Sequence, residues 1–433
     1  MKIACIGNMN NIQFTLCRYL RDKGLDAHLF LFSDEAIHFL PEADSYTTEF
    51  KKFTNTLDIS KETLFDRSRV KNVKKILEEF DFFIGTDVAP ALLRLINRKL
   101  DIFIPHGSDI YSFPFDTKFT KGVNKVWWLR TIWFTGKLQL EAIENCELII
   151  FPDEYETHFP YRSKLKSGPT FVDGTAPMLY TPQYSELNKI SPDSLQHAKN
   201  FLAIREKFDL IIFSHARQNG SKLSEKDKIH EKGNDKLIKG FAQFCRNQPN
   251  SNACLILFEY GMDIDSAKKL IEQESIESRV IWMPKMQRKE IMYGLSLSDI
   301  SCGEFENSWL TCGVVNESLA LNKPLLHFRD DKLYESNYAE LYFLLNAFSE
   351  GDITSQIEKF NQAKKETNQK ASAGSKWLEK YTVNRPVHLI TEKIQEAKSS
   401  YEKYSVFSNS NLFLTKLRLG ILTRFYRAKA KFF

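Results

Sequence analysis

The sequence lacks the features that mark membrane-spanning, disulfide-stabilised and zinc-binding proteins. No apolar run reaches the roughly 18 residues that a spanning helix needs, and the apolar run after Met1 is too short for a secretory signal. The seven cysteines are odd in number and include no Cys-x-x-Cys pair, which argues against a disulfide framework and against a zinc site. We therefore expect a cytoplasmic protein whose thiols are reduced and mostly buried.

A large excess of one charge is also missing. The formal net charge of +5 over 433 residues is too small to indicate a nucleic-acid partner, and the one clear basic patch lies near the C-terminus. The turn after the first expected strand holds only Gly7, so the glycine-rich dinucleotide fingerprint is absent and a tightly held NAD or FAD is not expected. The length predicts two or more domains.

Short apolar runs alternate with helical spacing along most of the chain. The first 32 residues read as a β-α-β unit, with a strand at Lys2–Ile6, a helix containing Phe14 and Leu20, and a strand at Ala27–Phe32. This unit predicts a right-handed parallel sheet. Further strands are expected at residues 82–85, 102–105, 148–151, 210–213, 253–258, 279–283, 300–302 and 325–328. Helices are expected at residues 329–348 and 359–380.

The most informative stretch lies between Asp299 and Asp330. A strand at residues 300–302 leads into a polar loop, and a short helix begins near Gly313 and stops before Pro324. Such a helix directs free backbone N–H groups towards a ligand, which suits a phosphate, and Glu317 lies one turn further along. Together these features fit a nucleotide sugar. The alternative is an ordinary edge of an α/β sheet on which Glu317 is simply solvated.

This stretch resembles the retaining glycosyltransferases of family four, which have the GT-B fold of two Rossmann-like domains with a cleft between them. The family pattern is Glu-x7-Glu followed by Ala-x-Ala-x-Gly-Lys-Pro, and Glu317-Ser-Leu-Ala-Leu-Asn-Lys-Pro matches its second half. In that family the second Glu binds the nucleotide ribose. The first Glu would fall at Trp309. Glu304 and Glu306 are the nearest acids, so either the loop is re-spaced or the contact to the donor sugar has changed.

The resemblance extends to the expected diphosphate site. Arg217 and the Lys232-Gly233 pair match, in type and order, the cations that clamp the donor diphosphate in that family. Two cations can offset the charge on a departing diphosphate, so neither a cofactor nor a metal ion is expected. The alternative is that both are solvated loop charges. Further donor contacts are expected from the amides of Gly313 and Val314 and, near the base, from Met283.

The resemblance also implies an acceptor site in the first domain. His106 and Asp109 follow the strand expected at residues 102–105, where open α/β sheets bind ligands. We read His106 as a contact to the donor sugar or phosphate and Asp109 as an acceptor contact; a purely structural loop histidine is the alternative. Gly7, Asn8 and Asn10 face the acceptor under the same reading, although asparagines also favour turns.

The C-terminal segment changes composition. Residues 405–433 contain no acid and many basic and apolar residues. At helical spacing, four of the basic side chains share an arc of about 80°: Lys416, Arg424, Arg427 and Lys431. A basic amphipathic helix of this kind can lie on an anionic membrane surface. Arg418 and Lys429 interrupt its apolar face, and docking on the protein itself stays open.

These expectations combine into one prediction of architecture and activity. We expect an N-terminal Rossmann-like acceptor domain at residues 1–185 and a nucleotide-sugar domain at residues 200–375. A closing helix at residues 376–400 packs back on the first domain, and the basic tail follows at 405–433. The activity is transfer of a sugar from a nucleotide sugar to a glycan or lipid-linked glycan at the inner face of the membrane. The alternatives are a nucleotide-sugar epimerase and a non-catalytic subunit.

Overall fold

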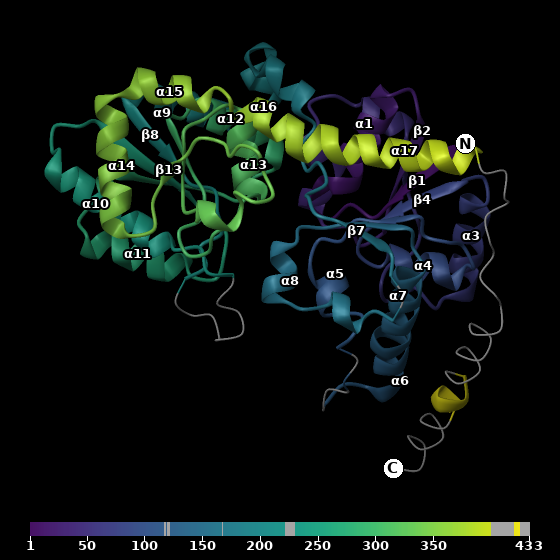
Figure 1. Cartoon of the computed structure of the whole chain (residues 1–433). Coiled ribbons are helices and arrows are strands. Elements are labelled where there is room, and N and C mark those ends of the chain that lie inside the picture. The colour runs from purple at the N-terminus through teal and green to yellow at the C-terminus, as the bar shows by residue number, and fades with distance from the viewer. Residues whose placement is uncertain (117, 119–121, 167, 221–229, 400–419, 425–433) are drawn as a thin grey trace. The chain divides into compact units, whose positions relative to one another are not determined.

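The chain folds into two compact units, each built on a parallel sheet. The structure, a computed structural model, describes residues 1–116, 118, 122–166, 168–220, 230–399 and 420–424. The N-terminal unit contains Met1–Tyr180 and resumes at Tyr381, and the C-terminal unit is Thr181–Lys380. Figure 1 shows the helices and strands of both units.

The N-terminal unit has a seven-stranded sheet in the order β3-β2-β1-β4-β5-β6-β7. Neighbouring strands in this order pair in parallel. The strands are β1 (Lys2–Ile6), β2 (Asp26–Leu31), β3 (Thr54–Thr56), β4 (Phe82–Gly85), β5 (Ile102–Phe103), β6 (Leu148–Ile150) and β7 (Thr170–Val172). Because side chains alternate along β1, Ala4 and Ile6 join one buried cluster and Ile3 and Cys5 the other.

Helices cover both faces of this sheet. They are α1 (Ile12–Asp22), α2 (Pro41–Asp44), α3 (Arg67–Leu77), α4 (Ala89–Leu95), α5 (Ser108–Tyr111), α6 (Lys125–Trp128), α7 (Thr135–Glu144), α8 (Glu154–His158) and α17 (Arg385–Ser399). The last of these comes from the far end of the chain. Its Val387, Ile390 and Ile394 are buried in the same cluster as Phe14 and Leu16 of α1, and Figure 1 shows α17 beside α1.

The C-terminal unit repeats this architecture with six strands in the order β10-β9-β8-β11-β12-β13. The strands are β8 (Leu210–Phe213), β9 (Ala253–Phe258), β10 (Val280–Met283), β11 (Ile300–Cys302), β12 (Leu325–His327) and β13 (Leu345–Asn346). The helices are α9 (Ala198–Lys207), α10 (Asn234–Asn247), α11 (Ile264–Gln273), α12 (Arg288–Ser296), α13 (Gly313–Ala320), α14 (Glu350–Gln362), α15 (Lys364–Ala371) and α16 (Gly374–Leu378).

In both sheets the order in which successive strands are added reverses at an equivalent place. The strand order reverses between β1 and β4 in one unit and between β8 and β11 in the other. Open α/β sheets bind ligands outside the carboxyl ends of the strands at such a point. The segments that follow these four strands are therefore the first places to look for a site.

The predicted α/β fold class is confirmed, and the predicted strands match closely. Those at 2–6, 82–85, 210–213, 253–258 and 300–302 have the predicted bounds. The prediction of a helix at residues 329–348 is wrong. That segment holds only a short 3-10 turn at Asp331–Leu333 and the two-residue strand β13. The strands β3, β7 and β13 were not predicted.

The basic tail lies mostly outside the described residues. Residues 420–424 are helical, and Arg424 is exposed there. The other basic residues of the tail lie outside the described residues: Lys416, Arg418, Arg427, Lys429 and Lys431.

Among the helices that the structure describes, none is both long and apolar enough to cross a membrane. All seven cysteines are unpaired, and all but Cys312 are buried.

Candidate functional site

A buried ion pair joins two loops at the carboxyl edge of the C-terminal sheet. Lys232 precedes α10, and Glu304 follows β11. The Lys232 ammonium lies 2.6 Å from Oε1 of Glu304, and the two side chains are only 13% and 6% exposed. The other carboxylate oxygen, Oε2 of Glu304, is buried and accepts no hydrogen bond from the described residues. Unpartnered buried polar atoms are uncommon, so this oxygen is a candidate ligand contact.

A second buried cluster surrounds the predicted ribose ligand Glu317. One carboxylate oxygen lies 2.5 Å from Nε2 of His215, which follows β8, and the other accepts a 2.9 Å hydrogen bond from Nε of Arg288 on α12. Burial opposes ionisation of Glu317, but His215 and Arg288 outweigh it and hold the pKa of Glu317 below its usual value. Glu317 is buried, so the solvated alternative is wrong.

The start of α13 lies beside both clusters. Its first residue is Gly313, and Cys312 precedes it as an N-cap without a side-chain hydrogen bond. Burial raises the pKa of the Cys312 thiol, and the charges of Glu304, Lys232 and Glu317 also act on it. Lys232, Glu304, Glu317 and the amides of Gly313 and Val314 therefore belong to one neighbourhood. It combines hydrogen-bond donors suited to a phosphate with two carboxylates suited to hydroxyl groups.

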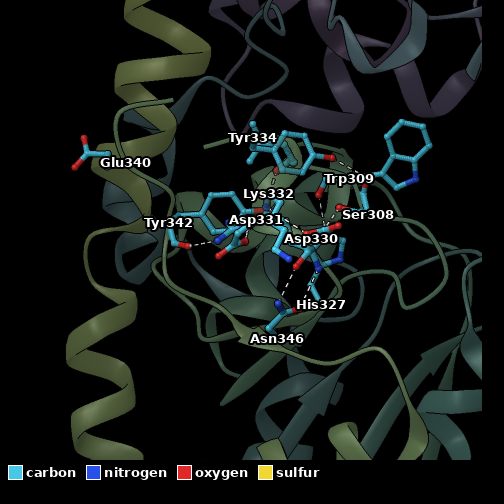
Figure 2. A network of polar contacts seen from close by, with 12 residues as sticks. Ser308, Trp309, His327, Asp330, Asp331, Lys332, Tyr334, Glu340, Tyr342 and Asn346 are labelled. Atoms are coloured by element: carbon cyan, nitrogen blue, oxygen red, sulfur yellow. Dashed lines mark hydrogen bonds and ion pairs between the residues drawn. The ribbon is translucent and has the colours of Figure 1, made fainter. Parts of the chain in front are cut away.

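The loop between Glu304 and α13 is held by side chains from outside it. Three consecutive carbonyl oxygens, those of Ser308, Trp309 and Leu310, accept hydrogen bonds from Tyr334 (2.7 Å), His327 (2.8 Å) and Tyr342 (2.8 Å), respectively. Figure 2 shows Ser308, Trp309 and His327 within this network. Trp309, which stands where the family pattern has its first Glu, is itself buried. This loop is therefore held by β12 and by the segment that follows it.

His327, the last residue of β12, makes hydrogen bonds to the backbone of that loop at two points. Its Nδ1 accepts a 2.9 Å hydrogen bond from the backbone N–H of Glu304, and its Nε2 donates to the Trp309 carbonyl. Burial lowers the pKa of His327, so the ring stays neutral and keeps Nδ1 as an acceptor. The backbone of Glu304 is thus positioned by a residue on the neighbouring strand.

The other predicted donor residues have different surroundings. Arg217 is exposed, and its guanidinium lies 5.9 Å from the ring centroid of Tyr260. Gly233 has a φ of +66°, and a side chain there would meet Phe305, so glycine is required for the turn into α10. Met283 is buried at the end of β10, which is two strands away from β8.

His106 lies in a charged cluster of the N-terminal unit. Its Nε2 faces Oδ2 of Asp109 at 3.6 Å and Oδ1 of Asp87 at 3.9 Å, and Lys61 pairs with Asp87 at 2.9 Å. Burial disfavours protonation of His106, but Asp109 and Asp87 outweigh it and raise the pKa of the imidazole. Asp87 follows β4 in the left-handed conformation, with φ of 53°, which non-glycine residues adopt at an energetic cost.

A further acid approaches this cluster. Glu35 follows β2, and burial together with the charge of Asp87 raises its pKa to about 7. The carboxyl edge of the N-terminal sheet thus gathers an imidazole and several carboxyl groups, and the pKa values of Glu35 and His106 are both raised. Such groups suit a ligand rich in hydroxyl groups.

Two of the predicted acceptor contacts, Asn8 and Asp109, make hydrogen bonds within the fold. Asn8 is fully buried; its Oδ1 accepts from the Phe14 N–H at 2.9 Å and its Nδ2 donates to Asn11 at 3.1 Å, which is the turn role left open above. Asp109 accepts from the N–H groups of His106 and Gly107, both at 3.0 Å.

Gly7 has a φ of +81°, and a side chain there would meet Thr86. Asn10 also has a positive φ, 56°, and is partly exposed. Of the four residues predicted to contact the acceptor, Asn10 is therefore the one with a partly exposed side chain.

Sequence reasoning did not select several residues that complete these clusters. They are Lys61, Asp87 and Glu35 in one unit and His215 and Arg288 in the other. Asp87 and His215 each follow a strand that borders a reversal of strand order. Their position after a buried strand is the signal that would have identified them.

Comparison with known proteins gives similarity at the level of structure alone. No family model matches the chain, and no curated protein matches it. The structure of HepE from Anabaena in complex with UDP and glucose has a TM-score of 0.54 at 16% identity, over 92% of this chain and 100% of that one. WaaG, a glycosyltransferase involved in lipopolysaccharide biosynthesis, has a TM-score of 0.51 at 12% identity, over 90% and 99%.

The fold is GT-B. The GT-B architecture is also found in UDP-GlcNAc 2-epimerase from Neisseria meningitidis, solved with UDP-GlcNAc, with a TM-score of 0.53 at 11% identity over 92% of this chain and 100% of that one. At these identities a likeness shows the fold alone, and family four is not distinguished from other GT-B families. Function has to come from the site.

Proposed function

We propose that this chain is a glycosyltransferase that transfers a sugar from a nucleotide sugar to a hydroxyl group of a glycan or lipid-linked glycan. The observation that carries the proposal is the neighbourhood of Lys232, Glu304, Glu317 and the start of α13 at the strand-order reversal of the C-terminal sheet. It supplies a cation and free amides for a diphosphate and buried carboxylates for hydroxyl groups. The structural neighbour HepE has been solved with UDP and with UDP-glucose, which supports the same choice.

The proposed roles follow from these positions. Lys232 and Arg217 hold the diphosphate, the amides of Gly313 and Val314 add hydrogen bonds, and Glu317 holds the ribose. The cations stabilise the charge that develops on the leaving diphosphate. The resemblance to family four suggests retention at the anomeric carbon, in which the leaving phosphate takes the proton of the acceptor, and His106 contacts the sugar. We further propose that the enzyme takes part in cell-surface polysaccharide synthesis and that it lies peripherally at the inner face of the membrane.

The test is to measure the melting temperature of the protein in the presence of UDP, GDP, ADP, TDP or CMP, because a bound nucleotide raises it. A ligand at about 100 times its dissociation constant should stabilise the protein by about 2.7 kcal/mol. We expect one nucleotide to raise the melting temperature of the wild type and to have little effect on Arg217→Ala. Because Arg217 is exposed, its loss should leave the unliganded melting temperature unchanged. Stabilisation of both proteins alike would contradict the role of Arg217.

An epimerase is the second candidate, because one structural neighbour is a UDP-GlcNAc 2-epimerase. Incubation with a nucleotide sugar in the absence of any acceptor separates the two. An epimerase would convert the free donor, whereas a transferase would leave its sugar unchanged until an acceptor is added. Binding without either product would indicate a non-catalytic subunit.

A further inference from the structure

The pair formed by Lys232 and Glu304 presents a difficulty for a phosphate site. A cation placed to bind a diphosphate is already neutralised, at 2.6 Å, by a carboxylate that is almost completely buried. Burial strengthens the attraction within the pair, so a diphosphate has to compete with Glu304 for the ammonium. This arrangement weakens binding of any ligand that offers only negative charge.

The second oxygen of Glu304 has the opposite requirement. Oε2 is buried without a hydrogen-bond partner among the described residues, and an ionised carboxylate only accepts hydrogen bonds. Phosphate oxygens also accept, so they cannot satisfy it, whereas a sugar hydroxyl can donate to it. The terminal phosphate of a free nucleoside diphosphate moreover carries about one more negative charge than the same phosphate esterified by a sugar.

The carboxylate cannot easily turn away from this role. The Glu304 N–H donates to Nδ1 of His327, and a side chain at Gly303 would collide with the same imidazole ring, so the backbone packs closely on β12. The loop beyond Glu304 is fixed by the carbonyl contacts of Ser308, Trp309 and Leu310. Glu304 is therefore held in place before any ligand binds.

From these contacts we propose that Glu304 is a specificity-determining residue that favours an intact nucleotide sugar over the free nucleoside diphosphate. The inference rests on the proposed function. It means that the leaving product is expelled: once the sugar has departed, the extra phosphate charge faces Glu304 and the donor to Oε2 is lost. Product inhibition by the nucleoside diphosphate should accordingly be weak.

The test compares Glu304→Gln with a matched control, Glu306→Gln. Glu306 lies in the same loop and pairs with Lys236 at 2.7 Å, but its side chain is 35% exposed. Dissociation constants of UDP and UDP-glucose are measured by calorimetry. If a different nucleotide stabilises the wild type in the thermal-unfolding test, its diphosphate and the corresponding nucleotide sugar are used. We expect Glu304→Gln to bind the nucleoside diphosphate about fivefold or more tightly than the wild type, without a comparable gain for the nucleotide sugar.

The control should keep the wild-type ratio of the two constants. An unchanged ratio in Glu304→Gln, with both ligands still bound, would overturn the role of Glu304 and leave the proposed function intact. Failure of the wild type and of Glu306→Gln to bind either ligand would overturn both proposals. Glu304→Ala, which also removes the charge, provides the same comparison if the Gln variant does not fold.

Discussion

At the scale of single residues, the buried carboxyl group of Asp101, outside both candidate sites, should make folding stability depend on pH. Burial raises the pKa of Asp101, which directly precedes β5, to about 7, although its Oδ2 accepts a 2.8 Å hydrogen bond from the Phe83 N–H. Between the unfolded pKa and this value the folded protein binds more protons than the unfolded chain. The contribution of Asp101 to stability is therefore present at acid pH and is lost as the pH rises towards 7.

Asp101→Asn should remove this pH dependence. Between pH 5 and 8 we expect the wild type to lose roughly 2 to 3 kcal/mol of unfolding free energy through Asp101. The variant should not show that loss, since an amide keeps the acceptor for Phe83 without ionising. Chemical denaturation at several pH values measures the difference. Parallel pH profiles for the two proteins would show that Asp101 does not titrate in this range.

The residues of the candidate site differ in how far the sequence predicts them. Lys232 and Glu317 stand in recognisable local patterns, a Lys-Gly pair before a helix and a Glu one turn into a helix. The partner of Lys232 lies 72 positions further along, and that of Glu317 lies 102 positions away. Only the parallel order of β8 and β11 brings them together. Local spacing therefore predicts a ligand residue but not the group that neutralises it.

At the scale of elements, the loop before α13 depends on hydrogen bonds to its carbonyl groups. Tyr342→Phe keeps the aromatic ring and removes the donor to the Leu310 carbonyl. We expect a loss of about 1 to 2 kcal/mol of stability, because a buried acceptor is left unpaired. The control is Tyr260→Phe, because the Tyr260 hydroxyl makes no hydrogen bond to the residues that the structure describes and Tyr260 is partly exposed. Equal unfolding free energies for the two variants would argue against a stabilising role for this contact.

Residues 329–348, which include Tyr342, show why some elements were predicted wrongly. Buried parallel strands appear in the sequence as short apolar runs, which is why most strands were predicted within one or two residues. Residues 329–348 contain many helix-forming side chains but are held in an irregular path by contacts such as those of Arg329, whose side chain donates to the Tyr342 carbonyl at 3.1 Å. Tertiary hydrogen bonds there outweigh local helix propensity.

At the scale of the whole molecule, the basic tail predicts association with anionic membranes. A chain that ends after Tyr404 lacks every basic residue of that tail. We expect the full chain, but not the shortened one, to sediment with vesicles that contain phosphatidylserine. Binding should weaken in high salt, because the attraction is screened. Equal sedimentation with purely phosphatidylcholine vesicles would contradict an electrostatic anchor.

The return of the chain to its first unit also bears on how the protein is made. The N-terminal core includes Val387, Ile390 and Ile394 of α17, whereas the C-terminal unit is complete within Thr181–Lys380. During synthesis, which proceeds from the N-terminus, the second unit can bury its core before the first has received its last helix. The apolar face formed by residues such as Phe14 and Leu16 then stays uncovered on the ribosome until residue 394 has emerged. In the growing chain, the unit that is begun first is finished last.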